Sequence, residues 1–326
     1  MAPATTGFLN DMSEPTVCLL GGTGFIGRSL AAELCSNNVK VRVPTRRADS
    51  ARRLRVLPTV NVRITDVHDP AALTEALRGC DAIVNLIGIL NESGNKGRGF
   101  DHAHADFAEK LLGAADAAGV KRLVQVSALK ASIDGPSYYL KSKGKAEKAI
   151  RESSLDWTIL QPSVVFGSED SFTNRFAGLL KLLPVLPLAR PNARFAPVYV
   201  GDVVAVIERA LRDEAMIGQT YQLCGPRVYS LRELVDFIRE TAGLGGSTLG
   251  LPDSLAKLQA RISEWVPGKP FSMDNFRSLT VHSICDTSGL KTLGIEPHSL
   301  EAMAPAWLAP VSEDARLDRF RRDAGR

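Results

Sequence analysis

The sequence predicts an α/β protein in which a doubly wound parallel sheet is followed by a small, mostly helical C-terminal lobe. Two observations predict this class. Short apolar runs alternate with amphipathic segments of helical period along the first half of the 326-residue chain, and the links between them are short. One link, the segment GGTGFIG at 21–27, joins an apolar run to a helical segment through closely spaced glycines.

The individual strands and helices follow from these apolar runs and segments of helical period. The run at 82–87 is apolar almost throughout, as a strand covered on both faces should be. A late strand at 219–223 would extend the sheet, and the spacing of a capping box at 230–233 predicts the start of a late helix. The remaining strands are expected at 17–20, 39–43, 60–64, 122–127 and 157–160, and the remaining helices at 25–34, 71–78, 107–118, 138–151 and 203–211.

Composition and charge exclude several classes of protein. A hydrophobic content of 44% and a charged content of 23% are typical of a globular protein, and no apolar run is long enough to span a membrane. A net charge of +4 is too weak to indicate a nucleic-acid partner. The five cysteines form no C-x-x-C pair, so we expect neither a disulfide framework nor a metal site, and a reducing cytoplasm is the simplest location. His102 and His104 are interpreted as part of a solvated helix start.

The segment GGTGFIG carries the fingerprint of a Rossmann domain. Its place between a buried strand and a helix strengthens a G-x-G-x-x-G pattern that is weak alone. Gly22 allows the tight turn, Gly24 lets the backbone approach a pyrophosphate, and Gly27 lets the helix pack on the strand. The pyrophosphate would bind the free N–H groups at the positive end of the helix dipole. We therefore expect a nicotinamide dinucleotide as cofactor.

The chain divides into four predicted parts. They are a flexible leader (1–15), an NAD(P)-binding Rossmann domain (16–230), a small lobe (231–310) and a densely charged tail (311–326). Within them, residues 184–197 are rich in proline and are expected to form a loop. Residues 245–310 lack strand–helix alternation and are expected to be helical.

The choice between the two nicotinamide dinucleotides depends on the end of the second strand. An NAD-specific fold places an acidic residue there, about 20 residues after the glycines. Here the place is taken by Thr45, Arg46 and Arg47, and guanidinium groups match the oxygens of a phosphate. NADP(H) is therefore favoured. Asp49 lies close enough to keep NAD(H) as the alternative.

Tyr139 and Lys143 form a Y-x-x-x-K element on one predicted helix. Residues four apart share a helix face, so an ammonium would lie beside the phenol and lower its pKa, which improves the phenol as an acid–base group. Ser127 ends the fifth strand, where ligands of such sheets bind, and is placed to donate a hydrogen bond to a substrate oxygen. These three are the predicted catalytic residues. The alternative is that Lys143 belongs, with Lys141 and Lys145, to a solvated basic face.

Together, the glycine segment, Ser127 and the pair Tyr139 and Lys143 resemble the short-chain dehydrogenase/reductase superfamily in its extended or atypical branch. Further segments narrow the resemblance to the bacterial relatives of the nucleotide-binding accessory subunit of respiratory complex I. They are Ser142-Lys143 with Glu147, PSVVFG at 162–167, FAPVYVGD at 195–202, Gly225-Pro226, PGKP at 267–270 and DNFRSL at 274–279.

The resemblance implies a tightly held NADP(H) and a link to quinone or respiratory metabolism. It also implies a set of nucleotide contacts along the carboxyl edge of the sheet. The residues expected there are Gly21, Thr23, Gly24, Phe25, Ile26, Gly27, Arg46, Arg47, Asp66, Val67, Leu86, Gly88, Lys143 and Pro162. Gln161 stands where relatives often have an arginine before the proline, which weakens the expectation of an anion contact at that point.

The sequence leaves three functions open. In the first, the nucleotide is structural and the lobe docks a partner in a respiratory assembly. In the second, the protein is an NADPH-dependent reductase of an apolar carbonyl or quinone-pathway intermediate. The third, a nucleotide-sugar epimerase, is disfavoured because no acidic pair lies between Ser127 and Tyr139. The apolar segment 176–188 is expected to be core under the lobe or, alternatively, a patch that meets a membrane surface on the inner face of the cell membrane.

Overall fold

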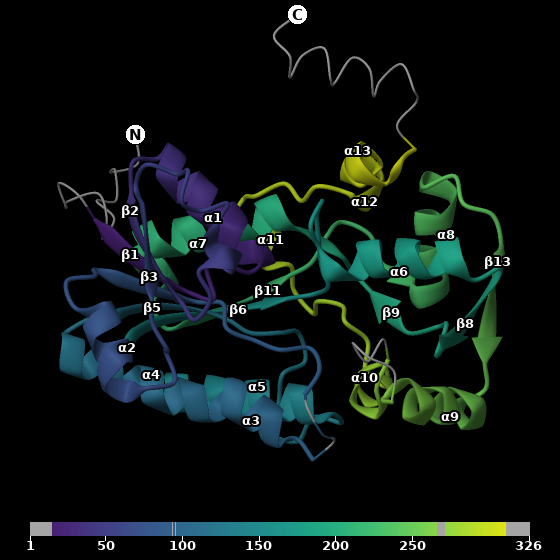
Figure 1. The fold of residues 1–326 in the computed structure, drawn as a ribbon, viewed down its shortest axis with the longest axis horizontal. Coiled ribbons are helices and arrows are strands. Elements are labelled where there is room, and N and C mark those ends of the chain that lie inside the picture. The colour runs from purple at the N-terminus through teal and green to yellow at the C-terminus, as the bar shows by residue number, and fades with distance from the viewer. Residues whose placement is uncertain (1–14, 93, 95, 266–270, 311–326) are drawn as a thin grey trace, which may run out of the picture.

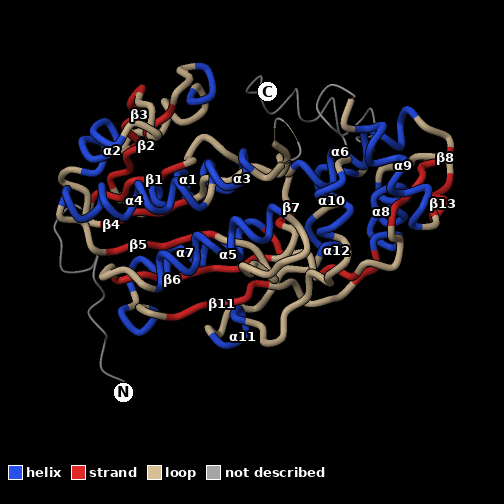
Figure 2. The backbone as a smooth tube through the Cα atoms, turned by 90° about the horizontal axis from the view of Figure 1, so that it is seen from below, coloured by secondary structure: helices blue, strands red, loops and turns tan. Residues whose placement is uncertain are grey.

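The computed structural model describes residues 15–92, 94, 96–265 and 271–310, and its centre is a seven-stranded parallel sheet (Figure 1). The strand order is β11-β6-β5-β4-β1-β2-β3, so the order of strands reverses next to β1, as in a doubly wound sheet (Figure 2). The strands are β1 (Thr16–Leu20), β2 (Lys40–Thr45), β3 (Val60–Ile64), β4 (Ala82–Asn85), β5 (Arg122–Val126), β6 (Asp156–Pro162) and β11 (Gln219–Leu223). The predicted fold class is confirmed.

Helices cover both faces of this sheet (Figure 1). Those that bury its faces are α1 (Phe25–Ser36), α2 (Pro70–Leu77), α4 (Ala105–Ala118), α5 (Tyr138–Arg151) and α7 (Val200–Arg212). On one face, α1 and α7 share an apolar core with the sheet, in which Leu30 and Ile207 are fully buried. On the other face, α2, α4 and α5 form a second core that includes Leu111 and Ile150. Because the sheet is covered twice, its central strands can be apolar on both sides.

A second body of structure, here called the lobe, lies beside the sheet, at the right of Figure 1. Its main elements are α6 (Ser171–Leu182), β8 (Val185–Ala189), α8 (Leu231–Thr241), β13 (Ser247–Leu251), α9 (Asp253–Ser263) and α10 (Met273–Ser278). Short helices α12 (Leu300–Met303) and α13 (Pro305–Leu308) close it. Its core buries Leu180, Leu188, Leu234 and Ile238. The predicted C-terminal lobe with mostly helical structure is thus present, and it also contains α6 and β8, from residues that were expected in the Rossmann domain.

Two segments of the lobe differ from the sequence-based expectation. The expected loop at 184–197 contains β8, and the expected helical region at 245–310 contains β13. The two strands pair in parallel, from Val185 opposite Ser247 to Ala189 opposite Leu251. Leu186 and Leu188 of β8 enter the lobe core, so tertiary burial stabilises a strand that local composition does not indicate.

The apolar segment 176–188 is partly core and partly surface. Leu180, Leu186 and Leu188 are buried, whereas Leu182 is 79% and Val185 47% exposed. The expectation of core therefore holds for part of the segment, and contact of its exposed part with a membrane surface stays a prediction. The predicted tail, all of the predicted leader except Pro15, and the segment PGKP at 267–270 lie outside the described residues.

Two of the five cysteines form a disulfide, which corrects the expectation from their spacing. Cys224 follows β11, and Cys285 lies in a segment that crosses beside it, with the two Cα atoms 6.0 Å apart. The partners are 61 residues apart in sequence, so no local motif indicates the pair. A reducing cytoplasm disfavours such a bond. The state of this pair is therefore a direct probe of the compartment in which the protein works.

Candidate functional site

The glycine-rich turn joins β1 to α1, and close backbone contacts determine its shape. Gly21 has a φ of +78°, and a Cβ there would lie 3.0 Å from the carbonyl carbon of Leu86. A Cβ on Gly27 would lie 2.5 Å from the Cα of Gly22, so a larger residue would push α1 away from the turn. Gly24 is the N-cap of α1 and has extended backbone angles. The turn thus has the geometry in which a helix N-terminus accepts a pyrophosphate.

The predicted contacts for the adenosine half lie on neighbouring strand ends. Arg46 and Arg47 directly follow β2 and are exposed, and Asp49 begins the short helix η1 (Asp49–Ala51) beyond them. After β3, a carboxylate oxygen of Asp66 accepts a hydrogen bond from the backbone N–H of His68. Because β3, β2 and β1 are adjacent in the sheet, these residues share one edge with the glycine-rich turn.

The other predicted contacts near the turn are Thr23, Phe25, Ile26 and Val67. The carbonyl oxygen of Thr23 accepts a hydrogen bond from the Arg28 guanidinium at 2.5 Å. Phe25 and Ile26 are half-buried, and their side chains pack against the sheet core. Val67 is buried after β3.

Lys143 forms hydrogen bonds at the ends of both β4 and β5. Its Nζ donates hydrogen bonds to the carbonyl oxygens of Val126, at 3.3 Å, and Ile87, at 3.5 Å. A Cβ on Gly88 would lie 3.3 Å from the same nitrogen. Ser127 follows Val126 directly; its hydroxyl oxygen is buried and has no hydrogen-bond partner within the described part of the chain. A buried hydroxyl without a partner is unusual, and it suits a site that a ligand completes.

Pro162 ends β6 beside the loop that carries Ser127. The backbone N–H of Leu129 donates to the carbonyl oxygen of Pro162 at 3.1 Å, so the predicted nicotinamide contact lies next to the predicted catalytic serine. Gln161 points elsewhere. Its side-chain amide donates to both carboxylate oxygens of Glu147, at 2.8 and 3.0 Å, in a buried pair. Gln161 is therefore a structural partner of α5, in agreement with the weakened expectation of an anion contact there.

Burial determines the charge states of the two predicted catalytic groups on α5. Desolvation lowers the pKa of Lys143 to about 8, and the Glu147 carboxylate acts in the opposite direction. Desolvation raises the pKa of Tyr139 to about 12. The expectation that Lys143 lowers the pKa of Tyr139 is therefore wrong, because burial of the phenol dominates. Tyr139 stays a neutral proton donor near neutral pH.

His104 is a member of the site that the sequence did not reveal. It is buried, not solvated as expected, and its ring lies edge-on to that of Tyr139 with centroids 5.7 Å apart. Its Nε2 accepts a hydrogen bond from the backbone N–H of Ile89, so its Nδ1 carries the proton that it shares with Ser142 Oγ at 2.7 Å. Burial first, and then the positive charge of Lys143, lower the pKa of His104 to about 2. The His104 ring is therefore neutral, and it packs against the ring of Tyr139.

Asp274 is a second residue of this kind, and it comes from the lobe. Its two carboxylate oxygens accept hydrogen bonds from the backbone N–H groups of Tyr138, at 2.7 Å, and Tyr139, at 3.1 Å. These are free N–H groups of the first turn of α5, beside the N-cap Ser137. The lobe therefore completes the N-terminus of the helix that carries Tyr139 and Lys143. The segment DNFRSL supports the family resemblance, but its sequence gave no signal of this contact.

Within the described ranges, no three His, Cys, Asp or Glu side chains come close enough together to hold an ion. In the same part of the chain, no helix combines the length and the apolar character that crossing a membrane requires.

Comparisons with known proteins agree with this geometry. Residues 21–176 match a family model described as NAD(P)H-binding. The mitochondrial NADH dehydrogenase (ubiquinone) 1 alpha subcomplex subunit 9 of Arabidopsis thaliana is 31% identical over 319 residues, which cover 92% of this chain and 79% of that protein. The chain belongs to the alpha subcomplex subunit 9 family. The resemblance inferred from the sequence motifs is thereby confirmed.

Two further comparisons are with reductases. A ceramide reductase of Caulobacter vibrioides is 31% identical over 189 residues, which cover 58% of each chain. The crystal structure of an NADPH-dependent quinone oxidoreductase of Escherichia coli, complexed with NADPH, superposes with a TM-score of 0.71 at 21% identity and covers 89% of this chain and 98% of its own. The second likeness shows a shared fold. Binding of a nicotinamide dinucleotide is thus supported by family, fold and site together.

Proposed function

We propose that this protein holds NADP(H) along the carboxyl edge of its sheet and acts as a nucleotide-bearing member of an assembly linked to respiratory complex I or quinone metabolism. The observation that carries the cofactor choice is the pair Arg46 and Arg47 at the end of β2, where an NAD-specific fold has an acidic residue. The link to complex I comes from the named role of the Arabidopsis relative, which aligns with nearly the whole chain.

The residues present fit such a nucleotide. The close contacts of Gly21 and Gly27 give the glycine-rich turn the shape that a pyrophosphate needs, and the ends of β4 and β5 meet where its nicotinamide end would lie. Pro162 would contact the nicotinamide, and Lys143 would hold the adjoining ribose. In this first candidate function the bound nucleotide stabilises the sheet edge and is not consumed.

The partner surface would be the face of α9 that lies away from the core. Leu255, Leu258 and Ile262 recur at helical spacing and are half or more exposed, whereas Ala256 and Ala260 of the same helix are buried. Such a helix buries its small residues and leaves its large apolar ones uncovered. We propose that this face meets the membrane surface near a quinone pool, with the protein peripheral on the inner, cytoplasmic side. A disulfide between Cys224 and Cys285 in the native protein would argue against this side.

The second candidate is an active NADPH-dependent reductase of an apolar carbonyl or quinone-pathway intermediate. It is favoured by the hydroxyl of Ser127, which has no hydrogen-bond partner among the described residues and directly follows Val126, whose carbonyl oxygen accepts from Lys143. Ser127 would donate a hydrogen bond to the substrate oxygen, and Tyr139 would donate the proton that this oxygen gains on reduction. NADPH, when bound, supplies the hydride. The reductases among the relatives support this candidate.

One experiment separates the two candidates. The purified protein is loaded with NADPH, and the absorbance of the reduced nicotinamide is followed before and after a panel of quinones and carbonyl compounds is added. A nucleotide that exchanges slowly and stays reduced supports the structural role. Oxidation with repeated turnover supports the reductase. A protein that binds neither NADPH nor NADH contradicts both.

A further inference from the structure

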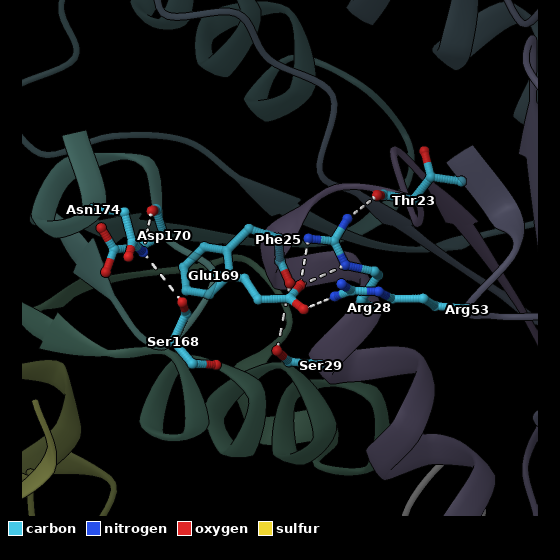
Figure 3. Close-up of polar contacts among 9 residues, drawn as sticks. All are labelled: Thr23, Phe25, Arg28, Ser29, Arg53, Ser168, Glu169, Asp170 and Asn174. Atoms are coloured by element: carbon cyan, nitrogen blue, oxygen red, sulfur yellow. Dashed lines mark hydrogen bonds and ion pairs between the residues drawn. The ribbon is translucent and has the colours of Figure 1, made fainter. Parts of the chain in front are cut away.

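Glu169 lies where three distant segments meet beside the glycine-rich turn (Figure 3). Its Oε2 accepts hydrogen bonds from Nε and Nη2 of Arg28, at 2.9 and 2.6 Å, and its Oε1 pairs with Nη1 of Arg53. Arg28 belongs to the start of α1, Arg53 to the connection between β2 and β3, and Glu169 to the loop between β7 (Val165–Phe166) and α6. One carboxylate therefore joins the start of α1 and the connection between β2 and β3 to a loop from the second half of the chain.

The loop that carries Glu169 is held in place by hydrogen bonds to its neighbour Asp170. The carboxylate of Asp170 is buried and accepts hydrogen bonds from the backbone N–H of Gly167 and from both the N–H and the hydroxyl of Thr173 (Figure 3 shows Asp170). Gly167 packs so closely on Phe25 of the turn that a Cβ would lie 2.8 Å from its ring. These contacts hold the loop in place, so the position of Glu169 relative to the two arginines is well defined.

Arg28 is oriented on its other side by the turn itself. Its Nη1 donates to the carbonyl oxygen of Thr23 at 2.5 Å, while Nε and Nη2 point to Glu169 (Figure 3). The guanidinium thus bridges the turn and the loop. Arg28 lies one residue after Gly27, in the first turn of the helix whose N-terminus would accept the pyrophosphate.

We infer that Glu169 is a positioning residue that retains the dinucleotide: with Arg28 and Arg53 it closes the rim of the glycine-rich turn, and the nucleotide leaves when this ion-pair cluster opens. This inference rests on the proposed binding of NADP(H). Partly exposed ion pairs are individually weak and are screened by salt, so the cluster acts on the rate of release and contributes little to the fold. Two pairs on one carboxylate slow release about fivefold to tenfold at low ionic strength.

The test measures release of NADPH from the full-length protein. Protein loaded with NADPH is mixed with a large excess of NADP⁺, and the loss of nicotinamide fluorescence gives the dissociation rate. Glu169→Gln should release NADPH about fivefold to tenfold faster at low salt, and the difference should shrink towards about 1 M salt. Glu75→Gln is the matched control, because it removes an exposed ion pair with Arg78 on α2. Its release rate should equal that of the wild type.

Arg53→Gln keeps the inference testable if Glu169→Gln perturbs the loop. The Arg53 side chain is 72% exposed, so its replacement leaves the fold intact. Release from this variant should be faster than from the wild type, and the double variant should release no faster than Glu169→Gln alone. Unchanged release in both single variants overturns the inference. Slower release also overturns it, because Glu169 would then compete with the phosphates for the arginines. Failure of the wild type to bind NADPH overturns the proposed function itself.

Discussion

Two regions of the protein depart from ordinary burial in opposite directions. At the carboxyl edge of the sheet, polar side chains are buried: Lys143, His104 and Ser127 are each no more than 5% exposed. On α9, apolar side chains are exposed: Leu258 is 52% and Ile262 60% accessible to solvent. Both arrangements cost stability in the isolated chain. The difference indicates what would complete each region, a small polar ligand at the sheet edge and an extended apolar surface at α9.

The largest expected effect tests whether the sheet edge is catalytic. If the protein is a reductase, Tyr139→Phe should lower turnover by about 10²–10⁴ because a positioned proton donor is lost, while NADPH affinity stays nearly unchanged. Lys143→Ala should weaken both, since this lysine would also hold the nicotinamide ribose. Steady-state kinetics and NADPH titration measure the two quantities. Tyr138→Phe, one residue away and stacked under Arg277, is the matched control. Full activity of Tyr139→Phe would remove Tyr139 from the mechanism.

The next effect compares two helices of the lobe that have 11 residues each. Leu234 of α8 is buried in the lobe core, so Leu234→Ala should lower the free energy of unfolding by about 2–5 kcal/mol. Leu258→Ala on α9 removes the same atoms from an exposed site and should change it by no more than about 0.5 kcal/mol. Denaturant titration measures both. Equal losses would mean that the α9 face is covered, and the comparison of the two regions would fail.

The sequence predicted the sheet well because its elements depend on local period and turn chemistry. The strands expected from 17–20 to 157–160 match β1 to β6 to within two residues at each end, and the glycine-rich link joins β1 to α1. The lobe was predicted less well. Its strands β8 and β13 are stabilised by each other and by the core, and such long-range pairing leaves no periodic signal in either segment.

The candidate site also contains residues that the sequence predicted and residues that it did not. Ser127 and Lys143 could be named because a strand end and helix spacing place them at one edge, whereas Pro162 was implied by the family resemblance. His104 and Asp274 act through contacts with residues 38 and more than 130 positions away, and the disulfide spans 61. The direction of the Tyr139 pKa was wrong because burial, which depends on the whole fold, outweighs one neighbouring charge. The roles of the site residues stay predictions.

The buried ammonium of Lys143 gives the sheet edge a pH dependence that the α9 face lacks. The pKa of Lys143 is about 8 in the folded protein and about 10.4 in an unfolded chain. Between these values the unfolded chain holds a proton that the folded protein has lost, so this group makes stability rise with pH, by up to about 1.4 kcal/mol per pH unit. Denaturant titrations from about pH 8 to pH 10 should show this rise in the wild type relative to Lys143→Met. Lys145→Met, on the exposed side of α5, should keep it. If the free energy of unfolding changes with pH in the same way in the wild type and in Lys143→Met, the pKa of Lys143 is not lowered.

A smaller effect concerns the choice of nucleotide at the sheet edge. NADPH should bind more tightly than NADH by about 1.5–3 kcal/mol, the scale of charge-assisted hydrogen bonds from Arg46 and Arg47 to a phosphate. Replacing both arginines with alanine should remove most of this difference in paired titrations. Asp49→Asn tests the alternative: it should leave NADH affinity unchanged if NADP(H) is the natural ligand. Equal affinities of the wild type for both nucleotides would reject the preference.

The smallest effect is expected at the exposed apolar face, and it tests whether a membrane covers that face. Part of the native protein should sediment with membranes at low salt and be released by high salt, because several weak apolar and electrostatic contacts add up at the surface. Leu258→Glu on α9 should reduce the sedimenting fraction, since it places a charge where an apolar side chain would enter the lipid. Leu183→Glu, at the end of α6, should also reduce it if the exposed part of the segment 176–188 belongs to the same surface.

The control for this experiment adds the same charge without removing an apolar contact. Ser254 is exposed on α9, so Ser254→Glu should lower the sedimenting fraction less than Leu258→Glu does. Denaturant titration must show that each variant is as stable as the wild type, because an unfolded variant would also change its sedimentation. A wild type that stays wholly in the supernatant at low salt excludes a membrane as the occupant. Equal losses in the two α9 variants would mean that charge, and not the apolar stripe, governs the association, and the stripe would then have no part in binding the membrane.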